Sequence, residues 1–400
     1  MAFLSRIIDP RPVLPQKRQL FSNQALKAMI IPLMIEQLLQ LIVGIADTMM
    51  VSYAGEATVS GVSLDTMIYT IFIFLFTAVA TGGAVVVSQY LGRGDRDNAN
   101  LAASQGYFIA GALSLVCLAL TLLFGNAVLA RLYASVDGEV MSACQVYLRI
   151  VALSFPANAI YNAGAALYRS MGRTRTTMVV SGVMNLLNVI GNAIGVFVLH
   201  AGAAGVAWPT TLSWYVAAVV MTALCFRENQ EVRIEWKQML RLDAAMSKSI
   251  LRIAVPNAAE GVLFQLAKVV LGSLIATFGT SQIAANGIGQ TLWSLAACMC
   301  VSMSPVFITV VGRCMGAGDA DAADWYMRKL SRLTVLLSAT WNGLVLLLVL
   351  AILPLYAVTP QTRALIWTVV VIHNLFAARY SSRRIPTVLQ AHTPLSCISI

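Results

Sequence analysis

The residues of this sequence that could do chemistry are the ionisable side chains inside its long apolar stretches. Of the 17 acidic residues, three lie inside such stretches: Glu36, Asp47 and Glu260. A charge inside an apolar span is costly, so each of these residues is a functional candidate. A carboxylate in a cavity of low dielectric constant can exchange a proton, or can bind a cation in place of that proton. The pattern therefore favours ion binding.

The first stretch carries a polar stripe. Glu36, Gln40, Gly44 and Asp47 follow one another at i, i+4, i+8 and i+11. At about 100° per residue, eleven positions bring a helix back to within about 20° of its start. The stripe must face protein or water, and Asp47 is the better ion-coupling candidate. Two alternatives remain: Asp47 is a structural hydrogen-bonding residue, and Glu36 only satisfies backbone groups freed by Pro32.

Amide side chains recur at helical spacing further along the chain. Asn158 and Asn162 are four residues apart, and Asn185, Asn188 and Asn192 lie on one side of the next stretch. Amides coordinate cations and hydrogen-bond to carboxylates. The alternative is that they join neighbouring helices, which contributes about 1 kcal/mol for each hydrogen bond.

Lys268 is a basic residue inside the seventh apolar stretch. It follows Glu260 by eight residues, about 12 Å along a helix, which is too far for a direct ion pair. Gln40, Asn158, Asn162 and Lys268 are the predicted substrate-cavity residues. The alternative for Lys268 is that its side chain extends to the membrane interface.

Enzymatic chemistry has no support in the sequence. No nucleophile–base pair, no Cys/His cluster with metal-ligand spacing and no cofactor loop stands out, so we predict no catalytic residue and no metal site. The motifs at 92–95 and 316–319 resemble phosphate loops, but neither follows a predicted strand. They are better interpreted as tight turns in which an Asp caps the next helix.

The elements that position these residues are membrane helices. The chain is 58% hydrophobic and 11% charged, with a mean hydropathy of +0.77, which excludes a soluble enzyme or a nucleic-acid binder. Long apolar runs without period-two alternation predict an all-α polytopic protein. The predicted spans are 28–52, 66–91, 104–124, 140–163, 176–199, 203–226, 249–277, 287–311, 330–353 and 361–378.

The basic residues predict the orientation of the spans. Twenty of the 27 Lys and Arg residues lie in the N-terminal segment and the even-numbered loops, and two lie in the opposite loops. Basic loops stay in the cytoplasm, so the N-terminus is expected there.

The sequence also repeats internally at an offset of 224 residues. Pro32 matches Pro256, Glu36 matches Glu260, and the motif at 92–95 matches that at 316–319. Six spans separate the copies, so the two halves form parallel-repeat helical lobes, between which a substrate cavity is expected. We predict a cytoplasmic segment at 1–27, an N-lobe with spans 1–6 at 28–226, a linker at 227–248 and a C-lobe with spans 7–10 at 249–378. The polar segment 379–400 is too short to cross a bilayer, so we expect an incomplete C-lobe followed by an atypical tail.

Several motifs resemble the multidrug and toxic compound extrusion (MATE) family of secondary transporters. They are PLMIEQLLQLIVGIADTMMVSYAG at 32–55, QYLGRGD at 89–95, ALYRSMGRTR at 166–175, the Asn ladder and the repeated GxGD at 316–319. The resemblance covers about residues 20–378. It implies a fold of two six-helix lobes, twelve spans in all, and export of cationic or amphipathic organic compounds across the inner membrane in exchange for H+ or Na+.

The resemblance also implies roles for individual residues. Asp47 matches the acidic residue of the family's first span, Asn188, Asn192 and Thr210 match its first-lobe cation site, and Glu260 matches its second-lobe acid. Asn192 stands where some members carry an acid, which leaves the choice of ion open. We expect no cofactor beyond the coupling ion, a monomer in the bilayer, small organic cations as partners and no nucleic acid.

Two other functions remain open from the sequence. One is a lipid-linked sugar flippase of the same superfamily, which needs several cationic residues in the cavity, whereas only Lys268 qualifies here. The other is a non-transporting, truncated family member, suggested by the missing spans and the tail.

Overall fold

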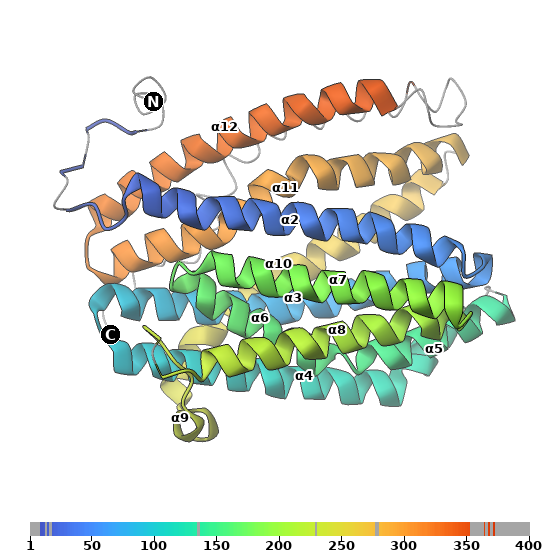
Figure 1. Ribbon diagram of the computed structural model, residues 1–400, viewed down its shortest axis with the longest axis horizontal. Coiled ribbons are helices and arrows are strands. Elements are labelled where there is room, and N and C mark those ends of the chain that lie inside the picture. Colours follow the sequence, from blue (N-terminus) through green and yellow to red (C-terminus); the bar gives the residue numbers. More distant parts are fainter. Residues whose placement is uncertain are drawn as a thin grey trace. The chain divides into compact units, whose positions relative to one another are not determined.

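The computed structural model describes residues 9–12, 14–15, 18–133, 137–228, 230–276 and 280–352, together with five helical positions between 364 and 372. These residues form helices and turns, with no strand among them (Figure 1). The helices are α2 (Asn23–Ser52), α3 (Glu56–Arg93), α4 (Arg96–Leu132), α5 (Gly138–Ala152), α6 (Phe155–Ser170), α7 (Thr174–Ala193), η2 (Ile194–Val198), α8 (Gly202–Cys225), α9 (Trp236–Leu240), α10 (Ala244–Ala276), α11 (Thr280–Gly316) and α12 (Ala320–Ile352). Apart from those five positions, predicted span 10 lies outside the described residues, and so does the tail at 379–400.

The predicted all-α membrane architecture is confirmed. Within the described residues, eight helices are long and apolar enough to cross a membrane, or up to nine if a bent pair counts as one span. Large apolar side chains such as Leu123 and Val219 are exposed along these helices. Exposed apolar residues along a whole helix suit a lipid environment, because lipid tails are as apolar as these side chains.

The fourth span differs from its prediction. The sequence suggested one helix over 140–163, whereas the structure has α5 and α6, bent by 46° between them. Pro156 lies in the first turn of α6. A proline has no backbone N–H to continue the preceding helix, so a new helix starts there.

Two compact units make up the chain. One contains Met1–Gln37 and Leu263–Ile400, and the other contains Leu38–Val262. The boundaries fall inside α2 and α10, so each of these helices contributes its two halves to different units. The lobe boundaries expected from the sequence at 28, 226 and 249 remain predictions.

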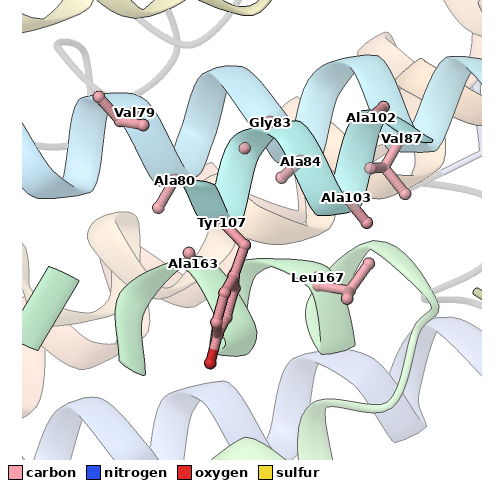
Figure 2. A pocket seen from close by; sticks show the side chains of 11 residues that line it. Val79, Ala80, Gly83, Ala84, Val87, Ala102, Ala103, Tyr107, Ala163 and Leu167 are labelled. Atoms are coloured by element: carbon pink, nitrogen blue, oxygen red, sulfur yellow. The ribbon is translucent and has the colours of Figure 1, made fainter. Parts of the chain in front are cut away.

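Small residues form the centre of the 38–262 unit, where α3, α4 and α6 meet. Gly83 and Gly106 lie so close that a Cβ on Gly83 would stand 3.8 Å from the Cα of Gly106. Figure 2 shows the Ala and Gly residues of this contact and the Tyr107 ring extending away from them. The Tyr107 hydroxyl pairs with Thr222 Oγ1 at 2.5 Å. The remaining cavity of about 20 Å³ has an almost wholly apolar lining, so it is a packing gap and not a ligand site.

The other unit is built around α11, α12 and the chain before α2. Phe307, Tyr326 and Leu330 are fully buried in its core. The described residues between 9 and 22, which we call the N-terminal arm, pack on the first turns of α12. Tyr326 donates to the backbone oxygen of Phe21 at 2.7 Å, and Trp325 Nε1 donates to that of Pro10 at 3.2 Å.

Both copies of the GxGD motif form the predicted turns. Gly94 and Gly318 have φ values of +77° and +75°, the left-handed region that favours glycine. Asp95 accepts a hydrogen bond from the Asn98 backbone at 3.1 Å, and Asp319 accepts one from Ala322 at 2.9 Å. The prediction of tight turns with a capping Asp is therefore confirmed in both halves.

The repeat also includes the contacts that each half of the chain makes with the segment before its first helix. Gln105 on α4 and Lys329 on α12 are separated by the offset of 224 residues. Gln105 Nε2 donates to two backbone oxygens of the linker, at 2.6 and 2.9 Å, and its Oε1 accepts from Ser247 at 3.2 Å. Lys329 Nζ contacts Asn23 Oδ1 and Asp9 Oδ1, both at 2.7 Å. Asn23 is the counterpart of Ser247, so the two equivalent side chains contact residues at equivalent positions.

Candidate cation-binding site

Asp47, in the second half of α2, joins a cluster of polar side chains from α7 and α8. Its Oδ1 accepts a hydrogen bond from Asn192 Nδ2 at 2.9 Å. Asn192 is fully buried, whereas Asp47 is partly exposed. The carboxylate is therefore held by a buried neutral donor and keeps one side open.

Asn188 lies one helical turn before Asn192 and connects Asp47 to α8. With its amide nitrogen toward Asp47, it donates to both carboxylate oxygens, at 3.1 and 3.0 Å. Its oxygen then accepts from Thr210 Oγ1 at 3.0 Å, so both ends of the amide have a suitable partner. The structure thus brings together Asp47, Asn188, Asn192 and Thr210, all within the 38–262 unit.

The close packing of α7 and η2 against α8 determines this geometry. A Cβ on Gly195 would stand 2.0 Å from the backbone oxygen of Gly205. A Cβ on Gly191 would stand 2.6 Å from the Cβ of Pro209. Only glycine allows such approaches, and they place the Asn pair of α7 beside Thr210.

The donor atoms of the cluster suit a hard cation or a proton. Asn192 Oδ1 is buried and has no hydrogen-bond partner among the described residues. A buried oxygen without a donor is costly, and a cation would satisfy it together with the Asp47 carboxylate. Within the described part of the chain, no group of three or more His, Cys, Asp or Glu side chains could hold a metal ion. A transition-metal centre therefore has no support there.

The other predicted coupling residues lie elsewhere on α2 and α10. Glu36 is 1% exposed and belongs to the other unit, while Gln40 is exposed on the same helix as Asp47. Glu260 is exposed on α10. Asp47 is the residue of the α2 stripe that accepts hydrogen bonds from the α7 amides.

The α6 amides form a separate group. Asn162 Nδ2 donates to the backbone oxygen and to Oδ1 of Asn158, at 2.9 and 2.8 Å. Asn158 Nδ2 in turn donates to the Tyr69 hydroxyl at 3.3 Å. Asn158 is 1% exposed. These contacts match the alternative stated from the sequence, in which the amides join helices.

Lys268 lies in the other unit, between two aromatic rings. Its Nζ is 5.1 Å from the ring centre of Phe264 and 4.9 Å from that of Trp293. Both distances are within cation–π range.

Sequence reasoning missed one acidic residue. Asp65 lies on α3 and is 1% exposed. The predicted second span starts at 66, so Asp65 falls just outside it. The helix in fact begins at Glu56, and the apolar residues Val59 and Val62 before Asp65 are the signal that extends it.

Comparisons with known proteins identify relatives. The MatE family model matches residues 32–194. A probable multidrug resistance protein NorM from Thermotoga maritima is 26% identical over 357 residues, covering 88% of this chain and 75% of the relative. The uncharacterized transporter YisQ of Bacillus subtilis is 27% identical over 298 residues, 73% of this chain and 64% of the relative. The multidrug export protein MepA of Staphylococcus aureus is 26% identical over 66% of this chain and 58% of the relative. The matches to YisQ and MepA thus span less than two thirds of those proteins.

Solved structures share the fold. A MATE protein in complex with MaL6 has a TM-score of 0.85 at 17% identity, covering 92% of this chain and 82% of that one. A MOP superfamily transporter from Pyrococcus furiosus gives the same TM-score of 0.85, the same 17% identity, and the same coverage of 92% and 82%.

Proposed function

Because this chain belongs to the multidrug and toxic compound extrusion family, we propose that it is a cation-coupled antiporter that exports cationic or amphipathic organic compounds. It would work in the inner membrane with its N-terminus in the cytoplasm. The names of NorM and MepA support a multidrug exporter. The family members are transporters and not enzymes, which agrees with the absence of a catalytic pattern in the sequence.

The observation that supports coupling is the Asp47 cluster. The carboxylate accepts hydrogen bonds from two neutral amides, and Asn192 Oδ1 lacks a donor among the described residues. When H+ or Na+ binds, the charge of Asp47 is neutralised and the amides lose their ionic acceptor. Such a change gives the ion a different affinity for two conformations, which coupling requires.

The test is efflux of a fluorescent organic cation from cells expressing the 400-residue chain. We expect Asp47→Asn to abolish efflux, because the amide is uncharged and cannot exchange a proton or hold a cation. Asp321→Asn is the matched control, because its side chain is 82% exposed and lies outside the cluster. Full efflux from Asp47→Asn would contradict the proposal.

A second measurement identifies the coupling ion. Proteoliposomes are loaded with drug and given either a proton gradient or a sodium gradient. Transport driven by only one gradient, and lost in Asp47→Asn, assigns the ion to this site. Transport at the same rate in the absence of both gradients would refute coupling.

A further inference from the structure

The short helix α9 in the predicted linker exposes large apolar side chains beside basic ones. Trp236 and Leu240 are 60% and 70% exposed, and Leu242, which follows the helix, is 65% exposed. Lys237 and Arg241 are exposed as well. Positions four residues apart lie on one face of a helix, so the apolar pair at 236 and 240 runs next to the basic pair at 237 and 241. We call these five residues the linker patch.

Buried contacts of the same segment keep the linker patch on the outside of its unit. Val232 and Ile234, just before α9, are buried in the core of the 38–262 unit. Phe226, which follows α8, stacks on the Trp236 ring with 4.7 Å between the ring centres. The chain at 226–242 is therefore attached on one side, and its orientation is fixed by packing rather than by chance.

Hydrogen bonds from α4 set the level of α9 relative to the predicted membrane. Gln105 Nε2 donates to the backbone oxygens of Gln238 and Arg241, at 2.6 and 2.9 Å. Ser104 Oγ accepts from the backbone N–H of Glu235 at 3.0 Å. The predicted third span begins at residue 104, so these bonds place α9 at the end of that span, where lipid headgroups begin. There α9 lies beside α4 and protrudes from the helices around it (Figure 1).

The charge of the linker patch selects the kind of surface that it fits. Lys237 and Arg241 form no ion pair in the part of the chain that the structure describes. The nearby acids have other partners: Glu235 Oε1 accepts from Arg233 Nε at 3.1 Å, and Asp243 Oδ1 accepts a backbone N–H of the first turn of α10 at 2.7 Å. Free cations beside a tryptophan and leucines match an anionic lipid surface, where aromatic rings lie at the headgroup level and basic side chains meet the phosphates.

We propose that the linker patch binds the anionic phospholipids of the inner leaflet. Trp236, Leu240 and Leu242 enter the boundary between headgroups and acyl chains, and Lys237 and Arg241 contact lipid phosphates. The patch thereby attaches the linker to the leaflet on the side where the basic loops are expected. The inference goes beyond the proposed antiport and depends on neither the substrate nor the coupling ion.

Quenching of tryptophan fluorescence by brominated lipid tests the contact. The purified chain is reconstituted in nanodiscs of phosphatidylglycerol, with or without bromine on the acyl chains near the headgroup. The emission of Trp236 is the difference between the wild type and Trp236→Phe, because the other tryptophans of the seven are common to both proteins. We expect brominated lipid to remove most of this difference. A difference that is not quenched would overturn the proposal, since Trp236 would then face water or another protein.

Charge variants test the preference for anionic lipid. The Trp236 emission of the wild type should be quenched more in brominated phosphatidylglycerol than in brominated phosphatidylcholine, which has no net charge. Lys237→Gln/Arg241→Gln should abolish this preference. The control Arg93→Gln/Arg96→Gln removes the same charge at the turn 93–96, which carries no large apolar side chain, and should retain it. Equal quenching of the wild type in both lipids, or a preference that survives in Lys237→Gln/Arg241→Gln, would refute the role of the basic pair.

Discussion

The contact between the N-terminal arm and α12 gives a quantitative prediction for the variant Asp9→Asn. Lys329 Nζ lies 2.7 Å from Asp9 Oδ1, and the side chains of Lys329 and Asp9 are 7% and 25% exposed. Removing one partner of a fully buried pair costs about 3–5 kcal/mol. An exposed pair contributes about 0–1 kcal/mol. Asn23 and the Trp325 ring, 4.7 Å from Nζ, still contact the ammonium group. The expected loss is therefore intermediate, about 2 kcal/mol.

Thermal unfolding of the detergent-solubilised chain is the assay. We expect the apparent midpoint of Asp9→Asn to fall by about 3 °C. Asp321→Asn breaks a pair with Arg18 whose side chains are 44% and 82% exposed, and should leave the midpoint within about 1 °C. If Asp9→Asn is as stable as Asp321→Asn, the buried ion pair does not hold the arm.

The first lobe suggests a compensating change. Gln105 occupies the position equivalent to Lys329 and binds its linker without any charge. The double variant Asp9→Asn/Lys329→Gln should therefore recover at least half of the lost stability, because no buried charge remains unpaired. A double variant less stable than Asp9→Asn would show that the two lobes do not hold these segments in equivalent ways.

Two other predictions concern turns and close contacts. Gly195→Ala should abolish transport and lower the yield of folded protein, since its Cβ would stand 2.0 Å from the Gly205 backbone oxygen. Gly343→Ala, where nothing lies within 4 Å, is the control, and equal yields of the two variants would contradict the argument. Arg18 holds the pKa of Asp319 below its usual range, so this pair stabilises the protein above the ordinary Asp pKa and the effect is lost as pH falls through the lowered value. The difference in melting midpoint between the wild type and Arg18→Ala should shrink on acidification, and a difference that grows would refute this assignment.

The sequence predicts the helical spans and both capped turns because these depend on local composition and on glycine. It does not predict the bend between α5 and α6, where Pro156 interrupts an apolar run that is otherwise continuous. Asp65 was missed because hydropathy averages over a window, whereas the helix starts nine residues earlier, at Glu56.

The candidate site could be predicted only in part from the sequence. Helical spacing places Asn188 and Asn192 on one face of a helix, and the family resemblance relates them to Asp47. That these side chains meet Thr210 depends on the contact of Gly195 with Gly205, a property of two helices packed together. Periodicity in one helix carries no information about such a contact.

The offset of 224 residues shows where the two halves of the chain differ in their side chains. Asp47 corresponds to Leu271, and Gly44 corresponds to Lys268, which lies between two aromatic rings. The repeat therefore preserves the capped turns and the attached segments, which the fold needs. The side chains at positions 47 and 44 are not preserved, because their counterparts are a leucine and a lysine. No second carboxylate stands at the position equivalent to Asp47. If ion coupling depends on this position, the loss of Asp47 alone must remove it completely, and half of the wild-type coupling in Asp47→Asn would place the coupling carboxylate elsewhere.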